Sequence, residues 1–97
     1  MFWVDDGCPR SGTSHDGSFQ YKPYEAGVRC CSNDGATCST SLSCDTTKMS
    51  YVDAELKCFD DNRRLCSKAE ILSGICCGTG GNCDSYEVWT STTDSGT

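Results

Sequence analysis

Ten cysteines lie among the 97 residues of this chain, and they constrain its fold more than any other feature. This frequency exceeds the roughly 8 to 10% that marks a disulfide scaffold, and an even number lets every thiol find a partner. We therefore expect five disulfide bonds, each stabilising the fold by about 2 to 4 kcal/mol. The bonded residues would be Cys8, Cys30, Cys31, Cys38, Cys44, Cys58, Cys66, Cys76, Cys77 and Cys83.

The spacing of these cysteines favours disulfides over bound zinc. Structural zinc sites use Cys-x2-4-Cys pairs or histidine partners, whereas the close spacings here are Cys30-Cys31, Cys76-Cys77 and Cys38-x5-Cys44. Adjacent cysteines rarely bond to each other because that geometry is strained, so each doublet should staple two different segments to one point. We expect no cofactor, and an extracellular or secretory location, with an oxidising organelle lumen as the alternative.

Large apolar side chains are scarce. Leu, Ile, Val and Phe together number thirteen of 97 residues, below the roughly 20% under which a charged chain is usually read as disordered. The cysteines leave no stretch long enough for a second core, so we expect a single disulfide-rich domain over residues 1–97. Within it we assign an extended arm to residues 1–24, with short strands at most, the core to 25–92 and a tail to 93–97.

The net charge of −6 excludes two classes of partner. Nucleic-acid phosphates and anionic bilayers would be repelled by an acidic chain, so we expect neither. No run approaches eighteen apolar residues, which excludes a membrane span. Residues 1–6 lack the pattern of a signal peptide, so we expect a mature or excised module.

Two helices are predicted in the middle of the chain. Ser50 precedes Asp53 by three residues and Ser67 precedes Glu70 by three, and both pairs match the Ser-x-x-acid signature of a helix start. We place the helices at about 51–60 and 68–73, the second ending before Gly74. A terminal strand is expected over 86–92 because β-forming residues gather there.

The first predicted helix carries two sets of apolar residues. One stripe holds Val52, Leu56 and Phe59, and beside it lie Tyr51, Ala54 and Cys58. We expect Cys58 to anchor this helix to the core. The predicted fold class is thus a small, loop-rich, disulfide-rich α+β domain, with two short helices packed on a few short antiparallel strands and an extended N-terminal arm.

The run from 49 to 92 resembles cysteine-rich modules of secreted proteins from diatoms and related algae. The pieces that carry this resemblance are SYVDAELKC, RRLCSKAEI, GICCGTG and EVWTS, with GVRCCSNDG upstream. More distantly, the chain is similar to the first half of C-type-lectin-like domains. That resemblance implies two helices on a small antiparallel sheet, with Ala54 and Cys58 facing inward and Leu65 leading into the second helix. The calcium-binding motifs of those lectins are absent, and fold alone does not give function.

Catalysis finds little support in the sequence. The single histidine, His15, lies in a Gly/Ser/Asp-rich stretch, and oxidised cysteines offer no thiolate nucleophile. The carboxylate doublets Asp5-Asp6 and Asp60-Asp61 are typical of solvated turns. We therefore expect the protein not to be an enzyme.

Ligand binding is better supported near the last cysteine. Tyr86 and Trp89 could offer aromatic faces to a sugar, with Asn82 and Asp84 as hydrogen-bonding neighbours. Trp89 also fits the core of a terminal strand. Calcium is a second possibility, because Asp60, Asp61 and Asn62, or Asn82, Asp84 and Glu87, could supply oxygen ligands.

These observations favour a noncatalytic extracellular or lumenal module for adhesion, matrix structure, or glycan or protein recognition. The partner would be a protein or a glycan. The alternative is a structural subunit docked in a larger assembly within an oxidising lumen, held through the N-terminal arm with exposed Phe2 and Trp3. A protease inhibitor or toxin-like effector is a third hypothesis.

Overall fold

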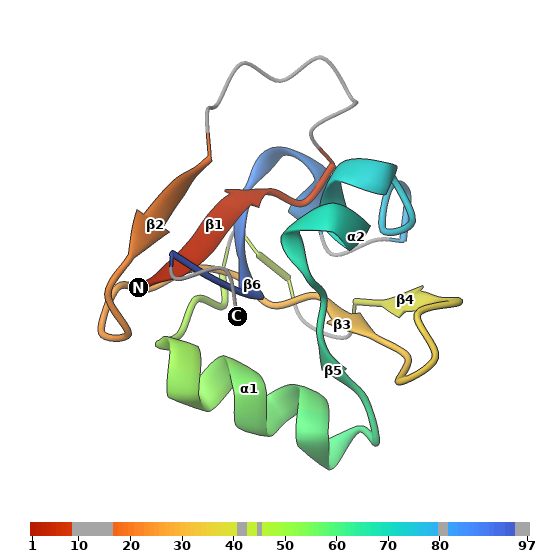
Figure 1. Cartoon of the computed structure of the whole chain (residues 1–97), viewed down its shortest axis with the longest axis horizontal. Helices are drawn as coiled ribbons and strands as arrows, with labels where there is room; N and C mark the ends of the chain where they lie inside the picture. Colours follow the sequence, from red (N-terminus) through yellow and green to blue (C-terminus); the bar gives the residue numbers. More distant parts are fainter. Residues whose placement is uncertain (9–16, 41–42, 45, 80–81, 95–97) are drawn as a thin grey trace.

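A computed structural model of the chain describes residues 1–8, 17–40, 43–44, 46–79 and 82–94. Within these ranges it holds two α-helices and two small antiparallel sheets of three strands each (Figure 1). The helices are α1 (Tyr51–Asp60) and α2 (Lys68–Ser73). The predicted fold class and both helix ranges are confirmed. His15 lies outside the described residues, so its role stays untested.

The first sheet has the strand order β2-β1-β6, and the second has the order β4-β3-β5. The second sheet consists of two-residue strands around the Cys30-Cys31 doublet. A short 3-10 helix, η2 (Cys83–Ser85), precedes the last strand. The strands are β1 (Phe2–Asp6), β2 (Ser18–Gln20), β3 (Cys30–Cys31), β4 (Cys38–Ser39), β5 (Arg64–Leu65) and β6 (Glu87–Thr93).

The N-terminal residues differ from the prediction in their role. They are extended, as expected, but β1 is the central strand of the first sheet rather than an arm outside the core. Val4 pairs with Trp89 in β6, and Trp3 pairs with Phe19 in β2. Val4 is fully buried. The core therefore begins at the first residues of the chain, and the tail begins later than expected because Thr93 still lies in β6.

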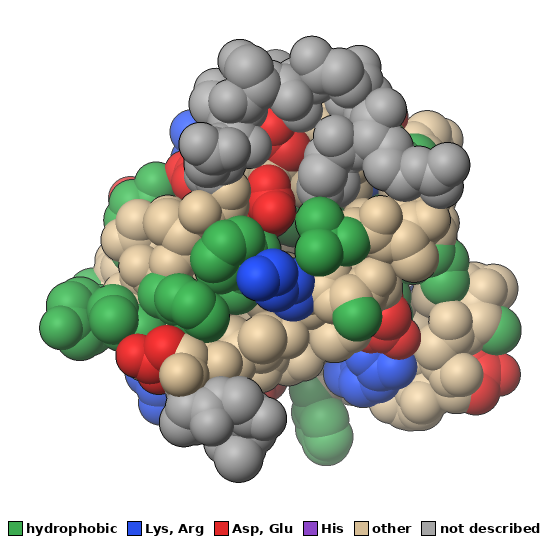
Figure 2. Space-filling view, turned by 45° about the horizontal axis from the view of Figure 1, so that its top comes forward, with side chains coloured by type: hydrophobic (Ala, Val, Ile, Leu, Met, Phe, Trp, Pro, Cys, Tyr) green, Lys and Arg blue, Asp and Glu red, His purple; other side chains and the backbone are tan. Residues whose placement is uncertain are grey.

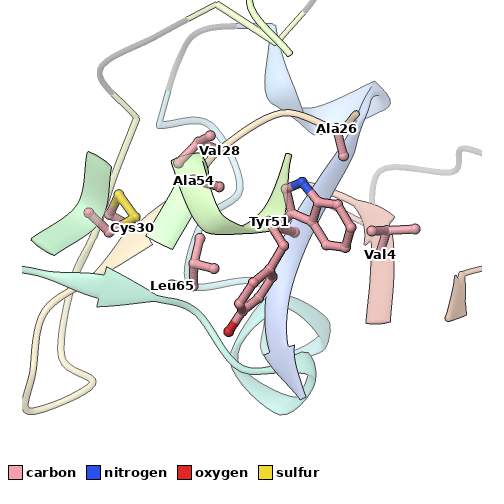
Figure 3. Packing of buried hydrophobic residues seen from close by; sticks show 9 residues of the cluster. Val4, Ala26, Val28, Cys30, Tyr51, Ala54 and Leu65 are labelled. Carbon is pink, nitrogen blue, oxygen red and sulfur yellow. A yellow bond between two sulfur atoms is a disulfide. The ribbon is translucent and has the colours of Figure 1, made fainter. Parts of the chain in front are cut away.

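Trp89 is the largest fully buried side chain and belongs to the larger hydrophobic cluster. Its ring makes an edge contact with Tyr51 of α1 at a centroid distance of 5.5 Å, and its Nε1 donates to the carbonyl of Met49 at 2.8 Å. The prediction that Trp89 fits the core is confirmed. The buried neighbours gathered around it (Figure 3) are Val4, Ala26, Val28, Cys30, Tyr51, Ala54, Cys58 and Leu65.

A second cluster consists largely of sulfur. It surrounds the buried side chains of Ile71 and Val88 with cysteines from five segments. All ten cysteines are bonded, which confirms the expected five disulfides. The bridges are Cys8–Cys77, Cys30–Cys58, Cys31–Cys66, Cys38–Cys76 and Cys44–Cys83.

Both cysteine doublets divide their bonds between two segments, as predicted. Cys30 is bonded to Cys58 in α1, and Cys31 is bonded to Cys66 just before α2. β3 therefore fixes both helices to one point of the second sheet. None of the described helices is long and apolar enough to cross a membrane.

Candidate interaction surface

The outward side of α1 carries three exposed apolar residues. Val52, Leu56 and Phe59 keep 47, 54 and 72% of their surface accessible. We call these three residues the α1 apolar face. In Figure 1, α1 lies along one side of the molecule, with the strands on its inner side only. The stripe read from the sequence is therefore a surface feature.

The opposite side of α1 is fixed by three buried residues one turn apart. Cys58 is bonded to Cys30, Ala54 is fully buried, and the Tyr51 ring lies between Phe2 and Trp89. Burial raises the pKa of Tyr51, and the charge of Glu55 adds to that shift. Because residues 51, 54 and 58 share one face of a helix, the disulfide turns the α1 apolar face toward solvent.

A groove of about 410 Å³ adjoins this face between α1 and β5. Its apolar lining comes from Leu56 and Phe59 of α1 and from Leu65 of β5. We call it the α1–β5 groove. Its polar lining comes from Glu55, Arg63, Arg64 and Ser91.

Charged side chains around the groove differ in how they are engaged. Arg64 forms a bidentate ion pair with Glu70, at 2.7 and 2.8 Å, and this contact raises the pKa of Arg64. Glu55 accepts a hydrogen bond from the Tyr51 hydroxyl. Arg63 donates to the neutral hydroxyl of Thr37 at 3.3 Å and lines the groove. The hydrogen bond from Ser32 is the largest cause that lowers the pKa of the exposed Asp34, and the charge of Arg63 is one of the smaller causes.

A second, more polar depression of about 240 Å³ lies around two half-exposed tyrosines. The Tyr24 hydroxyl donates to Glu87 at 2.5 Å, and this hydrogen bond raises the pKa of Tyr24. The Lys48 ammonium lies 5.6 Å from the centre of the Tyr86 ring. We call this site the tyrosine depression. Its lining residues are Asp6, Tyr24, Glu25, Ala26, Lys48, Tyr86 and Glu87.

The structure does not gather the four ligand-binding residues named from the sequence. Trp89 is fully buried. Asp84 accepts from the buried Arg29 guanidinium at 2.7 Å and from the Gly78 backbone, so its carboxylate is engaged. Asn82 precedes η2 with a left-handed φ of 57°. Of the four, Tyr86 is the residue that lines a described depression.

The acidic doublets lie in different environments. Asp5 and Asp6 are buried in β1, contrary to the expectation of solvated turn residues. The Asp5 carboxylate accepts from the Trp3 indole at 3.2 Å and from the Asp6 backbone at 2.8 Å, which compensates its burial. Asp60 and Asp61 end α1 and are exposed, as expected.

Phe2 and Trp3, which the sequence suggests as docking residues, make contacts within the molecule. The Phe2 ring stacks on Tyr51, and Trp3 makes an edge contact with Phe19 while the Lys68 ammonium lies 3.9 Å from its ring centre. Both are half-buried rather than exposed. The expectation of exposed Phe2 and Trp3 is therefore corrected, because their rings pack against Tyr51 and Phe19.

Four cysteines that are far apart in the sequence meet in the second cluster. The Sγ atoms of Cys31, Cys38, Cys66 and Cys76 lie within 4.8 Å of one another. Cysteine binds a metal ion as a thiolate. These four sulfurs are joined in two disulfides, so none of them is a thiolate ligand in this state. Spacing alone could not reveal this group.

Comparisons with known proteins add no functional assignment. No protein-family model matches the chain, and neither the curated proteins nor the solved structures give a match. The case for function therefore rests on the surfaces described above.

Proposed function

We propose that this protein is a noncatalytic recognition module, secreted or lumenal, that binds a protein partner through the α1 apolar face and the α1–β5 groove. The observation that carries the proposal is the exposure of Phe59 and Leu56 beside that groove. Burying a large apolar side chain is worth about 1.5 to 3 kcal/mol. The chain has only thirteen Leu, Ile, Val and Phe residues, yet it leaves Leu56 and Phe59 exposed instead of burying them in its own core.

The scaffold suits such a role. Cys30–Cys58 fixes α1 to β3, and the Ser50 side chain caps its first turn. A rigid helix loses little conformational entropy on binding, so more of the contact energy appears as affinity. Five disulfides indicate folding in an oxidising compartment, and secretion is part of the proposal.

The chemistry of the groove defines the partner segment. Leu56, Phe59 and Leu65 suit a large apolar side chain, and Arg63 suits a carboxylate next to it. Figure 2 shows acidic, basic and hydrophobic side chains interspersed over another face of the molecule, without a continuous basic patch. The lining of the groove therefore favours a protein segment in which an aromatic or aliphatic residue adjoins Asp or Glu.

A peptide library displayed on phage or yeast tests this proposal on the folded protein. We expect enrichment of sequences with a large apolar residue beside a carboxylate. Phe59→Ser should abolish their binding, and Arg63→Gln should weaken it. Leu72→Ser is the matched control, because Leu72 is similarly exposed but lies on α2. Equal binding by Phe59→Ser and wild type would refute the proposal.

Glycan recognition at the tyrosine depression is a second candidate. It is favoured by Tyr24 and Tyr86, which are both partly exposed and lie next to carboxylates that can bond sugar hydroxyls. Binding on a glycan array that is lost in Tyr86→Ala but kept in Phe59→Ser would support it. Binding that is kept in Tyr86→Ala, or no binding at all, would rule out glycan recognition at the tyrosine depression.

A further inference from the structure

Two disulfides of the second core cluster touch each other. Cys31–Cys66 joins β3 to the residue before the α2 cap, and Cys38–Cys76 joins β4 to the turn after α2. The Sγ atom of Cys66 lies 3.5 Å from that of Cys76 and 4.0 Å from that of Cys38. Each sulfur of the second bridge is therefore close to one sulfur of the first.

Such contacts bear on disulfide chemistry, because bridges exchange when a thiolate attacks a disulfide sulfur. Reacting atoms held roughly 3 to 3.5 Å apart meet the distance requirement of an attack geometry, which also needs aligned orbitals. If the Cys38–Cys76 bridge opens, a thiolate at Cys76 would have the sulfur of Cys66 at that distance. Opening one bridge thus places the other within reach of exchange.

The four sulfurs differ in access from solvent. Cys31, Cys66 and Cys76 are fully buried, whereas Cys38 is half-buried in β4. An external thiol can therefore reach the cluster most readily at Cys38. Attack there would leave Cys76 as the displaced thiolate.

We propose that Cys38 is a site of modification by small or protein thiols, and that attack there exchanges both bridges. The entering thiolate bonds to the Cys38 sulfur and releases the Cys76 thiolate. That thiolate bonds to the Cys66 sulfur and releases the Cys31 thiolate. The Cys31 thiolate then bonds to Cys38 and expels the entering thiol, which is regenerated, so the net reaction needs no oxidant or reductant.

The last step is favoured by the pairing of β3 with β4. Cys31 and Cys38 are direct partners in the antiparallel register, and side chains in that position have Cβ atoms about 4.5 to 5.5 Å apart. The exchanged pairs would be Cys31–Cys38 and Cys66–Cys76. The native bridges span separations of 35 and 38 residues, and longer loops restrict the unfolded chain more. The native pairing is therefore the stable one, and exchange transiently frees β3 and β4 from α2.

A variant that leaves one thiol in the cluster tests the exchange directly. In Cys38→Ser, the Cys76 thiol would face the Cys66 sulfur, which lies 3.5 Å away in the native protein, and we expect the free thiol to divide between Cys76 and Cys31, with a Cys66–Cys76 cross-link. The protein is alkylated in acidic denaturant, digested without reduction and mapped by mass spectrometry. Cys83→Ser is the matched control, in which the free thiol should stay on Cys44, because Cys44 lies outside the group of four close sulfurs.

A second experiment uses wild-type protein, so it does not depend on whether the variant folds. The protein is treated with a limiting amount of reduced glutathione and mapped in the same way. Because the native pairing is the stable one, we expect a small fraction of the protein to carry glutathione on Cys38 and a small fraction to carry the new Cys31–Cys38 and Cys66–Cys76 cross-links. Glutathione found first on another bridge, or a Cys38→Ser protein whose only labelled residue is Cys76, would overturn the proposal.

Discussion

Arg64 and Glu70 form a two-point ion pair, with Nη1 2.7 Å from Oε1 and Nη2 2.8 Å from Oε2. Glu70 also accepts the Ser67 backbone N–H at 2.8 Å, so one carboxylate joins β5 to the first turn of α2. The Arg64 hydrogen bonds are the largest cause that lowers the pKa of Glu70, to about 2. Desolvation acts in the opposite direction and is outweighed.

The Arg64–Glu70 ion pair should make a contribution to the free energy of unfolding that depends on pH. Because the pKa of Glu70 is lower in the folded state, the contribution is complete above the unfolded value of roughly 4.3 and is lost as the pH falls toward 2. We expect Glu70→Gln to lower the free energy of unfolding by about 1 kcal/mol at pH 7, a value discounted for solvent screening. Gln retains the capping role at this position.

Urea unfolding of Glu70→Gln and wild type at pH 7 and pH 2 measures this effect. The difference between the two proteins should be much smaller at the lower pH, where protonation of Glu70 has begun in the folded state. A difference that stays constant with pH would mean that the Glu70 charge is not what stabilises the junction.

Ala54 gives a prediction about packing between α1 and the sheets. It is fully buried among the residues around Trp89, so Ala54→Leu must force neighbouring side chains apart. Overpacking of a dense core costs about 1 to 3 kcal/mol. Val52→Leu enlarges an exposed residue of the same helix and should change stability by less than about 0.5 kcal/mol. Chemical denaturation of both variants compares them, and equal midpoints would contradict the described orientation of α1.

Gly27 approaches a disulfide closely and predicts an effect on bond formation. A Cβ at this position would lie 2.4 Å from the Cys44 sulfur and 2.9 Å from its Cβ. We expect Gly27→Ala to destabilise the fold by about 1 to 3 kcal/mol and to raise the fraction of unpaired Cys44. Gly78→Ala is the control, because its backbone is left-handed but a Cβ there meets nothing within 4 Å.

Thiol labelling and denaturation separate these two glycine variants. The strain of a left-handed backbone should cost Gly78→Ala about 1 kcal/mol without exposing any thiol. A Gly27→Ala protein with five intact bridges and unchanged stability would show that the close approach to Cys44 is not required.

Local signals explain why the helices could be predicted. The Ser50 and Ser67 side chains accept the backbone N–H groups of Asp53 and Glu70, as the sequence signature implies. Gly74 adopts the left-handed conformation expected after α2, with φ of 86°. These contacts involve residues within a few positions of each other, so the sequence carries them directly.

Long-range contacts explain what the sequence did not reveal. The pairing of Val4 with Trp89 joins the two ends of the chain, and no local pattern distinguishes such a strand from an extended arm. Disulfide connectivity is hidden for the same reason. The Cys30–Cys58 bridge in turn determines which side of α1 is buried, so the direction of the Leu56 and Phe59 stripe could not be read from its spacing.

The candidate sites show the same division between local and distant signals. Tyr86 was named because aromatic and polar residues adjoin it in the sequence, and it does line the tyrosine depression. Tyr24 shares that depression through its hydrogen bond to Glu87, across 63 residues. Asp84 is a predicted ligand-binding residue, but its carboxylate is engaged by Arg29, which comes from a distant segment that no spacing rule identifies.

Phe59 provides the sharpest test of the α1 apolar face. A large apolar residue in a helix is ordinarily a core residue, and truncating such a residue to Ala costs about 3 to 5 kcal/mol. Phe59 is 72% exposed, so we expect Phe59→Ala to change the free energy of unfolding by less than about 0.5 kcal/mol. Ile71→Ala, on the buried side of α2, is the matched control and should cost about 2 to 5 kcal/mol. Guanidinium unfolding without reductant measures both, and a loss at Phe59 comparable to that at Ile71 would place the stripe in the core and remove the basis for a recognition surface there.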